Sequence, residues 1–364
     1  MAKNDLKALR TRIDALDQQL LALINERAEC ARQVGKIKQA NQTKDVNVIF
    51  YRPEREAQVL RGIMANNQGP LKDEEIARLF REIMSACLAL EDPVKVAYLG
   101  PEGTFTQHAA IKHFGRSAVC LPMSAIDEVF REVCAGAVNY GVVPVENSSE
   151  GIVNHTLDSF MESSVHICGE VVLRIHQHLM VSEHTRRNQI SRIYSHSQSF
   201  AQCRKWLDAH WPMAERVAVN SNAEAAKRLA SEWNAAAIAG DMAADLYGLE
   251  KIAEKIEDRP DNSTRFLIIG NEPVPSCGHD KTSIIVEMRN EPGALLSVLE
   301  PFQIHNIDLT RIESRPSLSG TWNYVFFIDF DGHQDTAEVQ NTLERLSCQS
   351  NDIKVLGSYP KGVL

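Results

Sequence analysis

Apolar residues in the first forty positions recur at alternating spacings of three and four. The series is Leu6, Leu9, Ile13, Leu16, Leu20 and Leu23, and it resumes at Cys30, Val34 and Ile37. This spacing predicts one long amphipathic helix from about Lys3 to Ala40. Such a helix is roughly 55 Å long, which exceeds what a compact unit of about ninety residues needs, so we expect its apolar stripe to pack against a partner chain.

Arg27 stands where this stripe calls for an apolar residue. A buried guanidinium is costly unless an acid or an anion meets it. An ion pair within or between helices is one interpretation. Because Lys38 lies about three turns further on the same face, a pocket for a small carboxylated ligand is the other. Arg10 is roughly 25 Å from Arg27, so it reaches such a pocket only from the partner in an antiparallel dimer.

Two further helical runs follow. The second opens at Arg55-Glu56, and Glu91 lies near the end of the third, which has apolar positions at Ile76, Leu79, Phe80, Ile83, Cys87 and Leu90. Residues 1–92 are therefore predicted to be all-helical.

The pattern changes after Asp92-Pro93, where strand-like runs alternate with helical ones. Strands are predicted over 94–100, 140–145, 171–181, 192–195 and 235–240, and helices over 105–114, 125–135, 199–210 and 223–232. Such alternation is typical of an α/β domain.

Residues 271–280, with Pro273, Pro275 and Gly278, resemble a linker. The remainder has the order βαββαβ of a ferredoxin-like unit: strand 283–288, helix 293–305, strands 307–314 and 322–330, helix 336–347 and strand 353–357. We therefore expect domains at 1–92, 94–271 and 281–364.

Composition narrows the function classes. A net charge of −9 argues against nucleic acid as the partner. No apolar run approaches the length of a membrane span, and residues 1–10 do not resemble a signal peptide. Eight scattered cysteines without a C-x-x-C pair indicate reduced thiols, so we expect a cytoplasmic protein. His176 and His178 lack nearby acidic ligands, so no metal is expected there.

The middle domain carries hydroxyl and amide side chains at the end of each predicted strand, where α/β domains bind ligands. Each loop alone fits ordinary helix capping, but together they indicate a site for a polar, carboxylated molecule. No Lys or Cys nucleophile with an evident base is among them. The loops are 103–106, 144–149, 195–202, 220–222 and 262–266.

Residues 1–92 resemble the all-helical chorismate mutase domain, a three-helix chain that forms an intertwined dimer. The matching stretches are 9–17, Glu26-Arg27, 34–38 and 53–56. The resemblance implies that four cations hold the carboxylates and ether oxygen of chorismate and that Glu56 binds the ring hydroxyl. These cations are Arg10 (from the partner), Arg27, Lys38 and Arg55. The rearrangement is pericyclic and needs no nucleophile, only a fixed conformer and charge stabilisation.

The chain departs from that family at three positions. Glu91 stands where relatives often have Gln, Cys87 where they often have Ser, and Arg52 where some have Asp, after a longer loop at 41–51. Glu91 donates a hydrogen bond to the ether oxygen only when protonated, so we expect mutase activity to be favoured at acidic pH.

Residues 94–270 resemble prephenate dehydratase, a bilobed α/β fold like that of periplasmic binding proteins. The motifs are Gly103-Thr104-Phe105-Thr106, the run 142–151, Tyr194-Ser195-His196-Ser197-Gln198 and Thr264-Arg265-Phe266. The implied reaction removes CO2 and water from prephenate to give phenylpyruvate. By position, Thr264 is the expected proton donor to the departing hydroxyl, and the implied substrate-binding residues are Thr104, Asn147, Ser195, Gln202 and Arg265. Arg265 also opens an apolar strand, so a structural role remains the alternative.

The C-terminal unit resembles an ACT regulatory domain of the phenylalanine-sensing kind. It carries Gly293-Ala294-Leu295-Leu296 and Glu313-Ser314-Arg315-Pro316. The resemblance implies that L-phenylalanine binds at an interface between two such domains and inhibits the dehydratase.

End to end, the chain resembles the bifunctional chorismate mutase–prephenate dehydratase family. This resemblance implies the substrates chorismate and prephenate, the effector L-phenylalanine, a homodimer or larger homo-oligomer, and no cofactor. A non-catalytic sensor built from the same parts is one rival, and a cyclohexadienyl dehydratase acting on arogenate is another. The sequence leaves the choice between prephenate and arogenate open.

Overall fold

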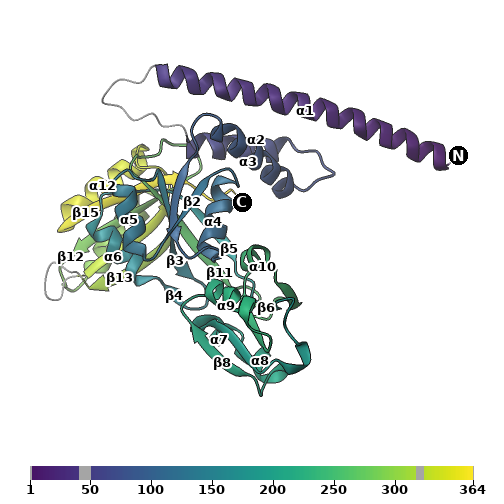
Figure 1. The fold of residues 1–364 in the computed structure, drawn as a ribbon. Coiled ribbons are helices and arrows are strands. Elements are labelled where there is room, and N and C mark those ends of the chain that lie inside the picture. The colour runs from purple at the N-terminus through teal and green to yellow at the C-terminus, as the bar shows by residue number, and fades with distance from the viewer. Residues whose placement is uncertain (1, 41–50, 317–323, 364) are drawn as a thin grey trace.

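The computed structural model describes residues 2–40, 51–316 and 324–363. It consists of a helical unit, two α/β lobes and a C-terminal α/β unit (Figure 1). The expected fold class is confirmed: all-α, then bilobed α/β, then βαββαβ.

The helical unit contains α1 (Ala2–Ala40), α2 (Pro53–Asn66) and α3 (Asp73–Ala89). The predicted long helix is confirmed as a single element of 39 residues. Of the expected loop at 41–51, only Tyr51 lies within the described residues. Near its C-terminal end α1 passes close to the end of α3, because a Cβ at Gly35 would lie 3.0 Å from Cγ of Glu91. A glycine at this position permits the approach.

The apolar stripe of α1 is open to solvent in the single chain. Its side chains range from Leu16, which is 41% exposed, to Leu9, which is 62% exposed. Figure 1 shows α1 as a rod that extends past α2 and α3. A helix with so much exposed apolar surface has a face suited to a partner.

The first lobe is a sheet of order β2-β1-β3-β11-β5, with β4 paired to β3. Its strands are β1 (Lys95–Leu99), β2 (Val119–Met123), β3 (Tyr140–Asn147), β4 (Gly151–Ile152), β5 (His166–Arg174) and β11 (Ser263–Gly270). Helices α4 (Phe105–Phe114), α5 (Ile126–Cys134) and α6 (Asn154–Glu162) belong to this lobe. The lobe has two apolar clusters. One contains residues of α4, and the other contains residues of α5 and α6. Both include residues of β3 and β11.

The second lobe is a sheet of order β10-β6-β9-β7-β8. Its strands are β6 (His178–Val181), β7 (Arg192–His196), β8 (Glu215–Val219), β9 (Ala235–Ala239) and β10 (Glu250–Ala253). The predicted strand at 171–181 is wrong as one element, because the chain leaves one sheet after Arg174 and enters the other at His178. It returns between β10 and β11, so two crossings join the lobes.

Two predicted helices of this lobe are also shorter than expected. The run at 199–210 is split into α7 (Ser197–Gln202) and α8 (Arg204–His210), because Cys203 has ψ of 14° and interrupts the helix. The run at 223–232 ends as α9 (Asn222–Arg228) and continues as a 3-10 turn over Leu229–Ser231. Helix α10 (Asp241–Tyr247) follows β9.

The C-terminal unit confirms the predicted βαββαβ order. Its elements are β12 (Asp280–Met288), α11 (Ala294–Ile304), β13 (Leu309–Pro316), β14 (Tyr324–Asp331), α12 (Ala337–Gln349) and β15 (Asp352–Pro360), and the antiparallel sheet has the order β13-β14-β12-β15. The part of the predicted strand at 322–323 lies outside the described residues. One face of the sheet packs on α11 and α12, and the other shares an apolar core with the first lobe through Phe327 and Tyr359.

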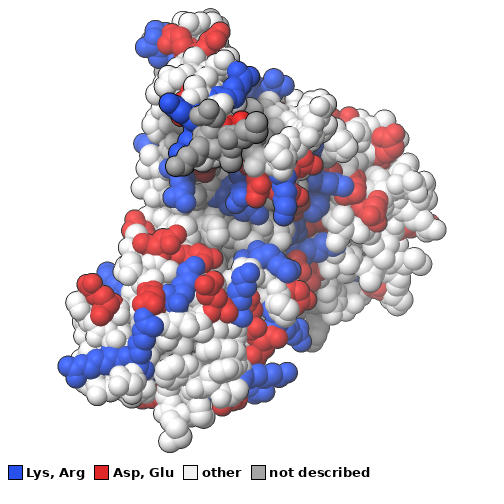
Figure 2. All heavy atoms as spheres, turned by 90° about the vertical axis from the view of Figure 1, so that its right-hand side faces the viewer, with Lys and Arg blue, Asp and Glu red and all other residues white. Residues whose placement is uncertain are grey.

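The surface carries both signs of charge. On the face in Figure 2, Lys and Arg side chains are interspersed with Asp and Glu side chains. Within the described residues, no helix is long and apolar enough to cross a membrane.

Candidate active and regulatory sites

Neighbouring strands of the first lobe bring Asn147 and Thr264 together. The two residues are cross-strand partners where β3 pairs with β11. Nδ2 of Asn147 donates to Oγ1 of Thr264 at 2.8 Å and to Oδ1 of Asn262 at 3.1 Å. All three residues are at most 9% exposed. The strand pairing therefore builds a compact, nearly dry group of polar side chains around the predicted proton donor.

The orientation of the Asn147 amide is set by the backbone after β3. Its Oδ1 accepts from the backbone N–H of Ser149 at 2.9 Å and of Glu150 at 3.2 Å. An amide with its oxygen held by two N–H donors must turn its NH2 group the other way. The turn after Asn147 thus aims Nδ2 at Thr264.

The second lobe contributes its own polar network. Oγ of Ser195 donates to Oδ1 of Asn222 at 3.0 Å, and Nδ2 of Asn222 donates to Oγ of Ser199 at 2.7 Å. Nε2 of Gln177 donates to Oε1 of Gln202 at 3.3 Å. Because Ser195 is fully buried and also bonded to the Ile238 carbonyl at 3.2 Å, it supports the network rather than presenting a free hydroxyl.

Gln202 joins the two lobes across a pocket. Its Nε2 donates to Oε1 of Glu150 at 3.0 Å, and Glu150 belongs to the turn after β3 in the first lobe. The pocket beside this contact has a volume of about 300 Å³ and is lined by Ser149, Glu150, Ala201, Gln202, Lys205, Glu257, Asp258, Arg259 and Asn262. Its volume suits a small molecule, and its lining combines the cations Lys205 and Arg259 with the acids Glu150, Glu257 and Asp258.

Thr104 caps α4 in the structure. Its hydroxyl accepts from the N–H of Gln107 at 3.4 Å and donates to the Leu99 carbonyl at 3.2 Å. The structure does not bring it into contact with Asn147 or Thr264, so among the expected substrate-binding residues it has an ordinary capping geometry.

Arg265 lies away from the cleft, which differs from the expected substrate contact. Its guanidinium meets Glu170 at 2.8 Å, Asp329 at 2.5 Å and the Tyr359 hydroxyl at 3.0 Å. Successive side chains of a strand point to opposite faces, so Thr264 contacts Asn147 on one face while Arg265 meets the C-terminal unit on the other. Burial opposes the charge of Arg265, but the adjacent acids dominate and raise its pKa further.

The expected mutase residues are only partly brought together. Lys38 on α1 pairs with Glu91 after α3 at 3.6 Å, and the Glu91 side chain is 9% exposed. Cys87 is buried one turn earlier, and Arg27 is partly buried. Arg10 and Arg55 are exposed.

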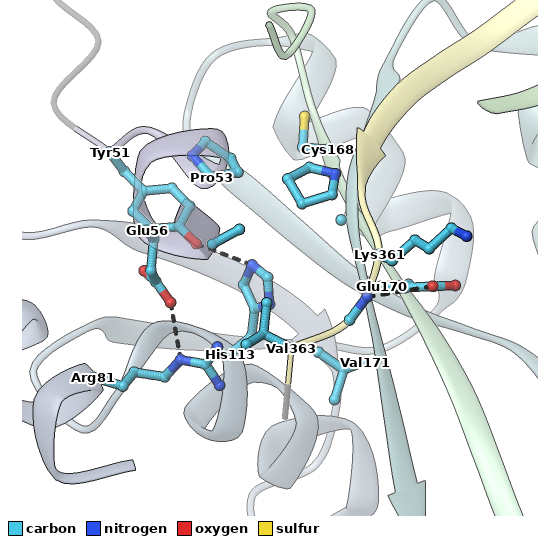
Figure 3. A pocket seen from close by; sticks show the side chains of 14 residues that line it. Tyr51, Pro53, Glu56, Arg81, His113, Cys168, Glu170, Val171, Lys361 and Val363 are labelled. Carbon is cyan, nitrogen blue, oxygen red and sulfur yellow. Dashed lines mark hydrogen bonds and ion pairs between the residues drawn. The ribbon is translucent and has the colours of Figure 1, made fainter. Parts of the chain in front are cut away.

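Glu56 lines a pocket at the junction of the helical unit with the first lobe (Figure 3). Its Oε1 accepts from Nε of Arg81 at 2.9 Å, and the Tyr51 hydroxyl contacts Nε2 of His113 at 3.1 Å. Burial raises the pKa of Glu56, while Arg81 opposes that shift. Burial, with Arg81 nearby, lowers the pKa of His113 to about 3.

The C-terminal unit has a pocket of about 330 Å³ at the start of α11. It is lined by Arg289, Asn290, Glu291, Gly293, Ala294, Leu295, Leu296, Ser314, Tyr324 and Phe326. Gly293 has φ of 90°, in the region that favours glycine. Four expected regulatory residues therefore meet here. Glu313 and Arg315 lie on the opposite face of β13 from Ser314, and Arg315 pairs with Asp158 of the first lobe at 3.0 Å.

Sequence reasoning placed Asn262 and Asn222 in the candidate loops 262–266 and 220–222 without giving either residue a role, and it did not single out Gln177 or Glu150. The first was detectable, because Asn262 precedes Thr264 by two positions and residues two apart share one face of an extended segment. The others come from different elements, and their meeting depends on how the lobes pack.

Three family models match the chain in order. They are chorismate mutase type II over residues 9–92, prephenate dehydratase over residues 96–274, and the ACT domain over residues 282–348. The chain is 67% identical over 365 residues to the bifunctional chorismate mutase/prephenate dehydratase of Pseudomonas aeruginosa, and the match covers 100% of both chains. The corresponding protein of Stutzerimonas stutzeri is 67% identical over 361 residues, with 99% of each chain covered.

A solved structure is similar over about three quarters of the chain. It is the prephenate dehydratase of Arthrobacter aurescens in complex with L-Phe, which is 34% identical with a TM-score of 0.69. The likeness covers 73% of this chain and 90% of that one.

Proposed function

The chain belongs to the bifunctional chorismate mutase/prephenate dehydratase family, and we propose how its own residues carry out the two reactions. The helical unit converts chorismate to prephenate, and the cleft between the lobes converts prephenate to phenylpyruvate. The two pockets lie on different parts of the fold, so prephenate passes between them through solution.

One observation carries the dehydratase assignment to Thr264. Its oxygen already accepts a hydrogen bond from Asn147, so the hydroxyl hydrogen is available to a substrate. In the reaction the bond to the ring carboxylate breaks and releases CO2, and its electron pair enters the ring. The bond to the hydroxyl breaks, and the departing oxygen takes one proton and leaves as water. Thr264 supplies that proton and recovers one from solvent.

For the mutase reaction we assign the site to the Lys38–Glu91 pair together with Arg27. Lys38 and Arg27 bind carboxylates and the ether oxygen, and Glu91 in its protonated form donates to that oxygen. Oε2 of Glu91 is buried 3.6 Å from Nζ of Lys38 and has no hydrogen-bond partner among the described residues, which leaves its hydrogen-bonding capacity to a ligand. Arg10 of the partner subunit completes the site.

We propose that the apolar stripe of α1 is buried against a second copy of this chain. The exposed stripe includes Leu9, Ile13 and Leu20, each more than half exposed. Burying such a stripe against an identical helix is favourable and places one chain's Arg10 near the other's Arg27.

We also propose that L-phenylalanine binds at the start of α11 and inhibits the dehydratase. The pocket there combines backbone N–H groups, Arg289 and the apolar Leu295 with Phe326. The sheet behind it is joined to the strand of Thr264 through Arg265 and Asp329. An effector that favours one arrangement of this sheet thereby changes the activity of the cleft.

The eight free cysteines support a cytoplasmic setting for the protein.

A time course with the purified chain tests these assignments together. Chorismate is supplied, and chorismate, prephenate and phenylpyruvate are followed with and without L-phenylalanine. We expect prephenate first, then phenylpyruvate, with the second step suppressed by the effector. Arogenate is supplied in parallel, and faster turnover of arogenate contradicts the proposed substrate. Binding of both substrates without turnover contradicts the enzyme assignment and supports a sensor.

A further inference from the structure

Asn262 has a buried amide nitrogen that nothing in the described structure satisfies. The residue is 2% exposed, and its Nδ2 has no hydrogen-bond partner among the described residues. A buried donor left unpaired destabilises the fold, so such groups are rare unless a ligand completes them. Asn262 also lines the pocket between the lobes.

The orientation of this amide is determined by its other end. Oδ1 of Asn262 accepts from Nδ2 of Asn147 at 3.1 Å and from the hydroxyl of Ser149 at 3.2 Å. Reversing the amide would place its NH2 group against the NH2 group of Asn147, whose own direction is set by two backbone N–H groups. Nδ2 of Asn262 is therefore the atom left for a ligand.

The same donor, Nδ2 of Asn147, connects Asn262 to Thr264. It donates to Oδ1 of Asn262 and to Oγ1 of Thr264. The free N–H of Asn262 and the free O–H of Thr264 therefore belong to one cluster. We infer that Asn262 is a further catalytic residue of the dehydratase, whose Nδ2 donates a hydrogen bond to the departing hydroxyl oxygen beside Thr264. This inference rests on the proposed dehydratase function.

The chemistry of the step favours this oxygen over the ring carboxylate. The departing oxygen gains negative charge as its bond to carbon breaks. The ring carboxylate loses its charge as it becomes CO2, so a donor held there would stabilise the substrate more than the transition state. A donor on the departing oxygen strengthens as the reaction proceeds, and its loss therefore lowers kcat rather than raising KM.

The test compares Asn262→Asp, Asn262→Ala and the parent chain across pH with prephenate as substrate. Aspartate keeps the shape and the acceptor but donates only when protonated, and burial raises the pKa of such a carboxyl. At pH 8 we expect kcat of both variants to fall about 100-fold, as when one donor to a developing oxyanion is removed. Between pH 8 and pH 5 the kcat of the Asp variant, divided by that of the parent, should rise roughly fivefold, and the same ratio for the Ala variant should not rise.

Asn271→Asp is the matched control, because Nδ2 of Asn271 donates to the Val133 carbonyl in the same lobe, away from the pocket. This control is expected to keep its kcat in the folded fraction and to show no recovery at acidic pH. Either Asn262 variant retaining kcat within about threefold of the parent overturns the inference, as does a loss confined to KM. The Ala variant decides the question if the Asp variant fails to fold. If the parent itself does not convert prephenate, the proposed function fails instead.

Discussion

Nδ2 of Asn147 donates a hydrogen bond to Oγ1 of Thr264 at 2.8 Å, and this contact leaves the threonine hydroxyl as a donor. An oxygen that already accepts from an amide is held in place, while its hydrogen remains available to a substrate. A threonine hydroxyl is a weak acid, so catalysis depends on such neighbours rather than on the residue alone.

Replacing Thr264 by Val preserves shape and removes the hydroxyl. We expect the dehydratase kcat to fall about 1,000-fold, within the range for losing a positioned proton donor. Mutase activity on chorismate should be unchanged because its pocket is on another unit. Thr264→Ser keeps the hydroxyl and should retain much more activity. Both activities are measured on the same preparation, and a parallel loss of both contradicts separate sites.

Leu16→Lys places a charge on the apolar stripe of α1. We expect the variant to sediment as a monomer, because burying an unpaired ammonium in a helix interface is costly. Mutase activity should fall about 100-fold if the partner's Arg10 completes the pocket, and dehydratase activity should remain. Gln18→Lys, on the other side of α1, is the control. A dimeric Leu16→Lys protein with full mutase activity argues against this interface.

Arg265→Met removes the guanidinium between the first lobe and the C-terminal unit. Glu170 keeps its ion pair with Lys281 at 3.0 Å, but the buried Asp329 loses its guanidinium partner, and breaking such a pair costs about 3–5 kcal/mol. We expect the free energy of unfolding in urea to fall accordingly, and a second change, Asp329→Leu, to recover part of it. The KM for prephenate should stay within about threefold. A large KM increase would instead restore Arg265 as a substrate ligand.

His113 should make the fold sensitive to acid. Its pKa is lowered to about 3 by burial and by Arg81, so the folded chain keeps the ring neutral while the unfolded chain binds a proton below about pH 6.5. Stability is therefore complete above that pH and declines as the pH falls toward 3. His113→Gln does not titrate and retains a polar group that can bond to the Tyr51 hydroxyl. Between pH 7 and pH 5 we expect the parent to lose about 2 kcal/mol more unfolding free energy than the variant. Equal losses in urea titrations would contradict the assignment.

Ser314→Phe should fill the pocket at the start of α11. We expect the affinity for L-phenylalanine, measured by calorimetry, to fall at least about tenfold, because the new side chain occupies the ligand's volume. Dehydratase activity without effector should persist. Ile312→Phe, on the same face of β13 but outside the pocket, is the control. Unchanged affinity in the Ser314 variant would place the effector elsewhere.

The elements that could be predicted from the sequence are those with a regular spacing of apolar residues. The spacing of Leu6 to Ile37 predicted α1, and α4 has the predicted bounds Phe105–Phe114, because a periodic apolar face is a local property of the chain. The βαββαβ order was predictable for the same reason. The strand predicted over 171–181 was not, since residues 175–177 contain no Gly or Pro to mark the point where the chain passes from one sheet to the other.

By itself, the sequence determined the order of elements, the family and the motifs that carry candidate chemistry. Tertiary structure alone decided which face each motif residue occupies. Alternation along a strand separates Thr264 from Arg265 and Ser314 from Glu313, but only the tertiary packing shows that Arg265 meets the C-terminal sheet and that Ser314 lines the pocket at α11. The free amide of Asn262 likewise depends on Asn147 and on the turn after β3, which lie more than a hundred positions away in the chain. Contacts between such distant segments leave no periodic signal.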